Sequence, residues 1–179
     1  SLIKPLNDEK AIEAGLDPIE DEALAVNGKT RAEIARAPHP KTVWQKFTTF
    51  VEKFNYKKSS WTAPIAAGHN IENFDMIIAE RLCQEHGPIN KKRNEQGLFN
   101  PIHRMDLMRD VFMWTENNPQ MRSVSMDSIR DWMGLSKENA HDALQDVKDT
   151  ALVLIKFLKL YRRFAPKVQF EKALANETL

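Results

Sequence analysis

Two short motifs carry the residues of this chain that could do chemistry. The first is His-Asp-Ala-Leu-Gln-Asp at residues 141–146, which opens the most strongly apolar helical pattern of the sequence. The second is Gly-His-Asn-Ile-Glu-Asn-Phe-Asp at residues 68–75, at a predicted strand-to-helix junction. Hydrolysis of a phosphodiester needs a base to deprotonate water, and hard cations, held by carboxylate oxygens, to bind the scissile phosphate. A histidine and two aspartates from separate elements fit this metal-dependent chemistry.

Helical geometry decides whether His141 and Asp146 can act together. Five positions correspond to about 140° around a regular helix, so the two side chains do not share a face there. They converge only if His141 lies in the frayed first turn, and Asn139 is well placed as the N-cap of that helix. Two purely structural alternatives stay open. One is that His141 is an ordinary exposed histidine in the first turn of the helix. The other is that the aspartates at 142, 146 and 149 form a solvated acidic stripe.

The second motif follows residues 64–68, a run of small apolar residues predicted as a buried strand. Ligands usually bind at the carboxyl end of a strand in an open α/β sheet, so Asp75, just inside the next helix, is a candidate metal ligand. Alternatively, its carboxylate only complements the helix dipole. His69 is expected to be structural. Asn70 either fixes the turn through its side chain or contacts a substrate, and the sequence leaves both open.

Composition indicates a single domain of ordinary type. The 179 residues are 42% hydrophobic and 28% charged, with a net charge of +1. This near-neutral charge argues against binding a polyanion over a whole face, but leaves a local groove open. No segment approaches the ~20 apolar residues of a membrane span. Cys83 is the single cysteine, which excludes an internal disulfide; we expect a buried thiol and a reducing, cytoplasmic compartment.

Short strands alternate with helices along the chain, which predicts an α/β fold. We expect one domain over residues 1–164 and a peripheral tail at 165–179. The predicted strands are residues 1–5, 64–68 and 102–107, with a polar loop at 87–100. The predicted helices are 30–37, 40–54, 73–86, 107–116, 126–133 and 140–164. The helices outnumber the strands, so part of the sheet that they should cover is missing. Because Ser1 enters directly on Leu-Ile-Lys-Pro, we expect the N-terminus to be trimmed, processed or disordered.

Apolar side chains at helical spacing predict three buried helix faces. The aromatic side chains between residues 44 and 54 could instead stack on bases, but their helical spacing favours packing in the core. The three faces consist of Trp44, Phe47, Phe50, Val51 and Phe54; of Phe74, Ile77, Ile78 and Leu82; and of Leu144, Val147, Ala151, Leu154, Ile155 and Leu158.

Together, the two motifs resemble the second and third motifs of the DnaQ-like, or DEDDh, 3′→5′ exonucleases. The family's His-Asn-x-x-x-Phe-Asp is matched by residues 69–75, and its His-x-Ala-x-x-Asp by residues 141–146. Leu-Ile-Lys-Pro resembles the family's third strand, and the resemblance covers about residues 1–160. It implies an RNase H-like mixed sheet flanked by helices, which lacks its first two strands in this chain.

The resemblance also implies roles for individual residues. Asp75 and Asp146 would be metal-binding carboxylates, and His141 would be the general base. Two divalent cations, Mg²⁺ or Mn²⁺, would lie about 4 Å apart. Carboxylate and water ligands suit these ions, and a histidine that titrates near neutrality suits the base. The family's first motif, Asp-x-Glu, has no match in the 179 residues. Its two carboxylates would have to come from upstream or from a partner chain.

These features favour a 3′→5′ exonuclease that hydrolyses single-stranded or frayed nucleic acid to nucleoside monophosphates. DNA is the expected substrate, RNA is the alternative, and no membrane partner is expected. The missing first motif supports a second hypothesis, a catalytically inactive nucleic-acid-binding or polymerase-associated module. An HD-type phosphohydrolase is set aside, because that family needs an aspartate well downstream and Asp149 is the last one. The oligomeric state stays open.

Two further groups of residues suit nucleic-acid binding without requiring it. Lys-Lys-Arg at residues 91–93 could steer a phosphate backbone, or could form an ordinary solvated loop. Trp61, Trp114 and Trp132 are candidates for stacking on bases.

Overall fold

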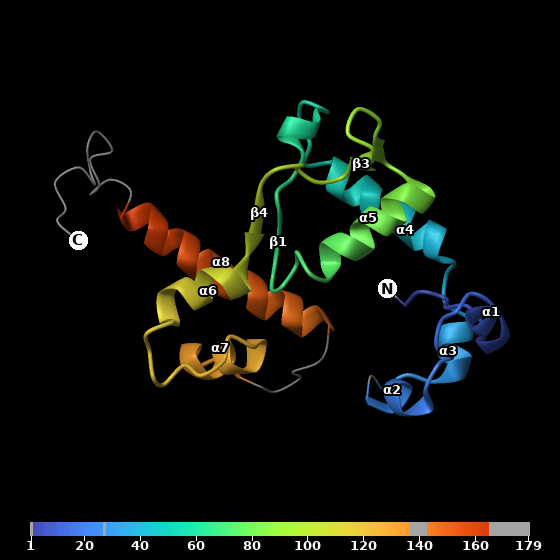
Figure 1. Cartoon of the computed structure of the whole chain (residues 1–179), viewed down its shortest axis with the longest axis horizontal. Helices are drawn as coiled ribbons and strands as arrows, with labels where there is room; N and C mark the ends of the chain where they lie inside the picture. The colour runs from blue at the N-terminus through green and yellow to red at the C-terminus, as the bar shows by residue number, and fades with distance from the viewer. Residues whose placement is uncertain (1, 27, 137–142, 165–179) are drawn as a thin grey trace. The chain divides into compact units, whose positions relative to one another are not determined.

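The computed structural model describes residues 2–26, 28–136 and 143–164 (Figure 1). Helices and a few short strands make up a mixed α/β structure. The chain divides into two compact units, Ser1–Met105 and Asp106–Leu179. Among the described residues, no helix is long and apolar enough to cross a membrane.

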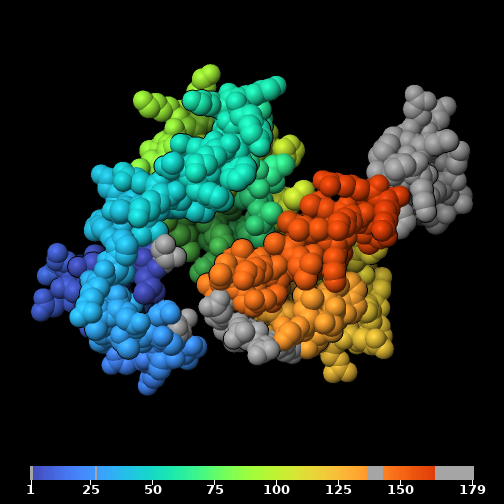
Figure 2. Space-filling view, turned by 180° about the vertical axis from the view of Figure 1, so that it is seen from behind, coloured from blue at the N-terminus to red at the C-terminus, as the bar shows by residue number. Residues whose placement is uncertain are grey.

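The first unit begins with three short helices, α1 (Asp8–Glu13), α2 (Asp21–Val26) and α3 (Arg31–Ala35). Figure 2 shows these blue segments gathered together. The predicted capping box is present: the Thr30 hydroxyl accepts from the Glu33 backbone N–H, and the Glu33 carboxylate accepts from the Thr30 backbone N–H. Arg31 donates to Asp8 at 2.9 Å and to Asp21 at 2.6 Å. A single guanidinium therefore links the first residues of all three helices.

The expected strand at residues 1–5 is wrong for its described part. Leu2 and Ile3 are exposed and lie outside any strand. The Lys4 N–H donates to the Pro38 carbonyl at 2.9 Å. This bond joins the segment to the loop that follows α3 and not to a strand. Helices α1 and α2 were not expected from the sequence.

The core of the first unit lies between α4 (Pro40–Glu52) and α5 (Asp75–His86). Pro40 occupies the first turn of α4 as predicted, and Gly87 ends α5 with a φ of 76°. Cys83 is fully buried, as expected, and burial raises the pKa of its thiol. The Trp44 indole N–H donates to the Gly87 carbonyl at 2.6 Å. The core cluster contains Trp44, Val51, Ala79, Cys83 and Leu98.

The predicted apolar faces of both helices are only partly buried. Phe47, Phe50 and Phe54 are exposed on the α4 side, although Trp44 and Val51 pack inward. On α5 the buried positions are Met76, Ala79 and Cys83, and the predicted Phe74 and Ile77 are exposed. The apolar residues of these helices outnumber the positions that the described core covers, so periodicity alone could not select the buried ones.

Residues 87–100, expected to be a polar loop, contain an antiparallel hairpin of β2 (Ile89–Asn90) and β3 (Glu95–Gln96). The Glu80 carboxylate accepts from the Gln96 N–H at 2.8 Å and joins the hairpin to α5. Residues 91–93 form the turn, where Arg93 pairs with Glu95 at 2.6 Å. The basic cluster thus lies in a hairpin turn, and Arg93, one of its three cations, is paired with a carboxylate.

Two further strands form a small second sheet. After the 3-10 turn η1 (Ser60–Thr62), the strand β1 (Ala66–Gly68) pairs with β4 (Arg104–Asp106). Both lie where strands were predicted. Ala67 is exposed, however, so the expectation that β1 is a buried strand is wrong. Within the described residues, neither face of β1 is fully buried.

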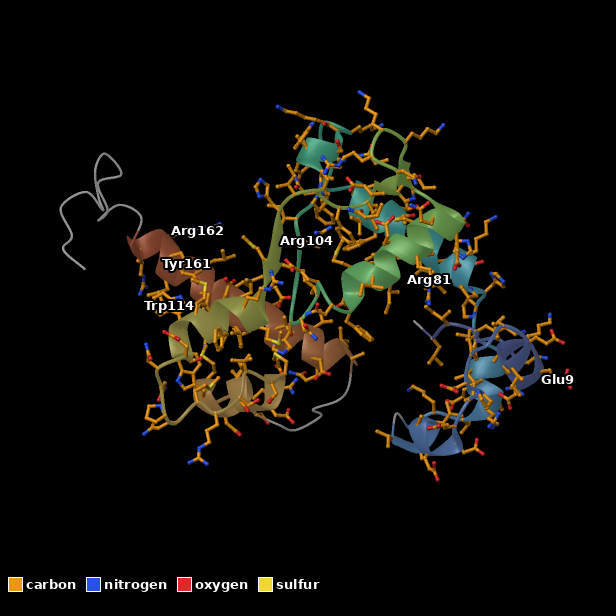
Figure 3. The ribbon with its side chains drawn as sticks, viewed as in Figure 1. Glu9, Arg81, Arg104, Trp114, Tyr161 and Arg162 are labelled. Carbon is orange, nitrogen blue, oxygen red and sulfur yellow. The ribbon has the colours of Figure 1, made fainter. Side chains whose placement is uncertain are left out.

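The second unit consists of α6 (Leu107–Thr115), α7 (Met126–Met133) and α8 (Ala143–Phe164), near the three predicted helices. Figure 1 shows α6 and α7 beside α8. The Trp114 indole N–H donates to the Tyr161 hydroxyl at 3.0 Å, and Figure 3 shows these two side chains together. The core of this unit consists of Leu107, Val111, Ile129, Val153 and Phe157.

The predicted buried stripe of α8 is displaced around the helix. Asp149, Val153 and Phe157 are buried, at intervals of four residues. Leu144, Val147 and Ile155, all predicted to face inward, are exposed. The displacement follows from Asp149, because an aspartate is buried when a partner compensates its charge, and the sequence pattern did not show that partner. Asn139 and the expected start of this helix at residue 140 lie outside the described residues.

Candidate functional site

The motif at residues 68–75 turns sharply between β1 and α5. Asn70 has a φ of 58°, in the left-handed region that asparagine tolerates better than most residues. Its side-chain oxygen accepts from the Asn73 amide at 2.9 Å. A Cβ added at Gly68 would lie 2.1 Å from the Cγ2 atom of Ile71, so glycine is the residue that fits. These contacts support a role for Asn70 in fixing the turn; a contact with substrate stays a prediction.

Asp75 is the first residue of α5, after Phe74 at the N-cap. The Met76 N–H donates to the Ile71 carbonyl at 2.8 Å, which fixes the entry to the helix. Asp75 is exposed, and the positive end of the helix dipole favours its negative charge. An exposed, ionised carboxylate at a strand-to-helix junction can bind a cation. His69, in the same turn, is partly buried.

The motif at residues 141–146 is described only in part. His141 and Asp142 lie outside the described residues, so the proposed convergence of His141 with Asp146 stays a prediction. Asp146 lies in the first turn of α8, with a side chain 39% exposed. Its Oδ1 atom accepts a hydrogen bond from Nη2 of Arg130 on α7. The solvated acidic stripe considered above is wrong for Asp149, which is buried.

Arg130 is a buried charged residue beside Asp146 that the sequence motifs do not include. Its side chain is 2% exposed, and three of its nitrogens reach three different aspartates. Nε donates to Asp149 at 2.8 Å, Nη1 donates to Asp127 at 2.9 Å, and Nη2 donates to Asp146. A sequence signal was available: Met126, Ile129 and Met133 mark the apolar side of α7, and Arg130 falls among them. A buried arginine there requires carboxylates as partners.

The pKa values of this cluster follow from its contacts. Burial alone would lower the pKa of the Arg130 guanidinium, but its hydrogen bonds to Asp149, Asp146 and Asp127 raise it above the ordinary value. The Arg130 hydrogen bond, together with that from Gln145 at 2.7 Å, lowers the pKa of Asp149 despite its burial. These contacts favour the ionised forms of Arg130 and Asp149, and three carboxylates surround the one guanidinium.

A second acidic pair lies at the start of α6. Asp106 is buried, caps the helix, and accepts from the Met108 N–H at 3.1 Å. One turn later, burial and the neighbouring Asp106 charge raise the pKa of Asp110. The sequence reasoning did not single out this pair. The cap explains Asp106 on structural grounds, so the pair adds no ligand to the candidate site.

The donor chemistry fits a hard divalent cation. The described candidates, Asp75 and Asp146, offer carboxylate oxygens, which suit Mg²⁺ and Mn²⁺. The single thiol, Cys83, is buried, so it does not favour zinc. Within the described ranges, no group of three or more His, Cys, Asp or Glu side chains is placed to hold a metal ion.

Comparison with models of known protein families assigns the chain to a family. The family model RNase_T, described as an exonuclease, matches residues 13–154. The chain belongs to this exonuclease family. The matched region contains both motifs, with Asn70, Asp75, His141 and Asp146. Exonucleases of this kind are nucleases that generally use divalent metal ions. No curated protein and no solved structure was found to match.

Proposed function

We propose that this chain is the catalytic domain of a metal-dependent 3′→5′ exonuclease of the DEDDh type. Its substrate is single-stranded or frayed nucleic acid, DNA in preference to RNA, and its products are nucleoside monophosphates. The observation that carries the proposal is the exonuclease family match, because its range includes both ordered motifs, residues 69–75 and 141–146. The proposal includes an RNase H-like fold, with the Asp-x-Glu carboxylates supplied from outside the 179 residues.

Each candidate residue has a defined task in this proposal. Asp75 and Asp146 hold the divalent cations through carboxylate oxygens. Bound Mg²⁺ or Mn²⁺ acidifies water and stabilises negative charge on the scissile phosphate. His141 accepts the proton of the attacking water at a ring nitrogen, as a general base with a pKa near the working pH can. Asn70 contacts the terminal nucleotide. Trp61, Trp114 and Trp132 are all exposed, as stacking on bases requires.

The decisive experiment follows release of mononucleotides from 3′- and 5′-labelled single-stranded DNA and RNA, with Mn²⁺ or with a chelator. We expect metal-dependent loss from the 3′ end, and faster loss from DNA. Asp146→Asn should reduce the rate at least ~10²-fold, because it removes a carboxylate that binds the cation. Asp127→Asn is the matched control, since Asp127 binds the same arginine but is assigned no metal. Full activity of Asp146→Asn would refute the assignment.

One observation favours a second candidate function, a catalytically inactive nucleic-acid-binding module. The Asp146 carboxylate already has a cationic partner in Arg130, so its side chain is held in place without a metal. The same labelled strands distinguish the two functions. Binding of single strands by the folded protein, with no hydrolysis in Mg²⁺ or Mn²⁺, would support the inactive module; 3′-end loss abolished by Asp146→Asn would exclude it.

A further inference from the structure

We propose that Arg130 is a positioning residue for the Asp146 carboxylate and thereby sets the affinity of the site for its divalent cation. This inference rests on the proposed function, in which Asp146 is a metal ligand. It adds a residue that lies outside both motifs and on a different helix.

The first argument is the geometry of the guanidinium. It presents its N–H groups in a rigid planar fork, and here three nitrogens reach three separate carboxylates. Asp146 and Asp149 belong to α8, while Arg130 and Asp127 belong to α7. The fork therefore fixes the first turn of α8 against α7 by direct contacts. Lysine could not reproduce this, because its ammonium is a single point at the end of a flexible chain.

The second argument is the gradient of burial across the cluster. The Asp149 side chain is 8% exposed and Arg130 is 2% exposed, whereas Asp146 is 39% exposed. Asp149 also accepts from Gln145, and Ile129, next to Arg130, is fully buried in the core of the second unit. The buried end of the guanidinium is thus immobilised. Its other end holds the carboxylate that faces solvent, where a cation can arrive.

The third argument is charge. Three carboxylates outnumber the single guanidinium, so the cluster keeps a net negative charge after pairing. Arg130 therefore orders the aspartates without cancelling their attraction for a cation. Partners of this kind orient metal ligands in many proteins, and their loss typically lowers metal affinity about 10- to 100-fold.

The test is a Mn²⁺ titration of the full chain, followed by the electron paramagnetic resonance signal of free Mn²⁺, which requires no nuclease activity. Arg130→Lys keeps the positive charge and removes the fork; we expect its Mn²⁺ affinity to fall at least ~10-fold. Asp127→Asn breaks the more exposed arm of the same guanidinium and removes one screened charge of the cluster, so its Mn²⁺ affinity should fall less than about threefold and clearly less than that of Arg130→Lys. Equal or tighter Mn²⁺ binding by Arg130→Lys would overturn the proposal, since it would make Arg130 a bystander or a competitor of the metal.

Two further variants keep the outcome interpretable. If Arg130→Lys fails to fold by circular dichroism, Asp149→Asn loosens the buried anchor and leaves both Arg130 and Asp146 in place. Weaker Mn²⁺ binding by that variant supports the positioning role, and unchanged binding overturns it. Asp146→Asn separates this inference from the proposed function. If Asp146→Asn loses affinity and Arg130→Lys does not, only the positioning role fails. If the wild type binds no Mn²⁺, or binds it no better than Asp146→Asn, both fail.

Discussion

Replacement of Arg130 by methionine should destabilise the second unit strongly. Methionine fits the apolar side of α7, but it leaves Asp149 buried with the Gln145 amide as its one remaining donor among the described residues. Breaking a buried ion pair by removing one partner costs about 3–5 kcal/mol. The contacts to Asp127 and Asp146 involve side chains 49% and 39% exposed, so each adds at most about 1 kcal/mol. The expected loss of unfolding free energy is therefore about 3–7 kcal/mol.

Urea denaturation followed by tryptophan fluorescence measures this loss, as a fall in the midpoint on the order of 2 M. Arg31→Met is the matched control. Arg31 also binds two aspartates, but its side chain is 47% exposed, so the substitution should lower the urea midpoint of the protein much less than Arg130→Met does. The double variant Arg130→Met/Asp149→Leu should recover much of the stability, because it removes the orphaned charge. The reasoning is refuted if Arg130→Met costs no more than Arg31→Met, or if the double variant is no more stable than Arg130→Met alone.

Three further expectations follow from contacts described above. Arg130 lowers the pKa of Asp149 in the folded state. The stability from this pair is therefore fully present above the unfolded-state pKa of about 3.9, and it is lost as the pH falls through the folded-state pKa. Urea midpoints measured between pH 6 and pH 2 should show this loss, and Asp149→Asn should make the midpoint less dependent on pH. Gly68→Ala should destabilise the first unit by about 1–3 kcal/mol, because its Cβ would overlap Ile71; a thermal melt unchanged from wild type would contradict the overlap. Cys83 is fully buried and the pKa of its thiol is raised, so Ellman's reagent should label it only in denaturant; rapid labelling of the native protein would contradict this.

The sequence predicted helix ends best where the residues that set them are close together in the chain. The capping box at Thr30, the proline at the start of α4 and the glycine that ends α5 placed helix ends within a few residues. Helices α1 and α2 were missed because each has six residues and depends on ion pairs with Arg31, which is distant in sequence. Local propensity cannot report such a contact.

Helix faces and the candidate site show the same limit. The pattern of α8 ranked Leu144 and Val147 as buried and Asp149 as solvated, and the structure reverses that order because Arg130 compensates the Asp149 charge. Asp75 and Asp146 could be found from their motifs, since their residue types and spacing are local. The position of Arg130 on the apolar side of α7 indicates a buried arginine, but its partners on α8 could not be predicted, because they meet it only once α7 and α8 are packed together.

The Arg31 contacts have a consequence for how the N-terminal region opens. Helices of five or six residues are too short to persist alone in water, since nucleation costs more than so few backbone hydrogen bonds return. One guanidinium joins the first residues of α1, α2 and α3, and it also donates to the Ile19 carbonyl at 2.6 Å. Loss of that side chain's position therefore removes support from all three helices at once. Residues 8–35 should open and close as one cooperative segment, at a lower free energy than the core around Trp44 and Cys83.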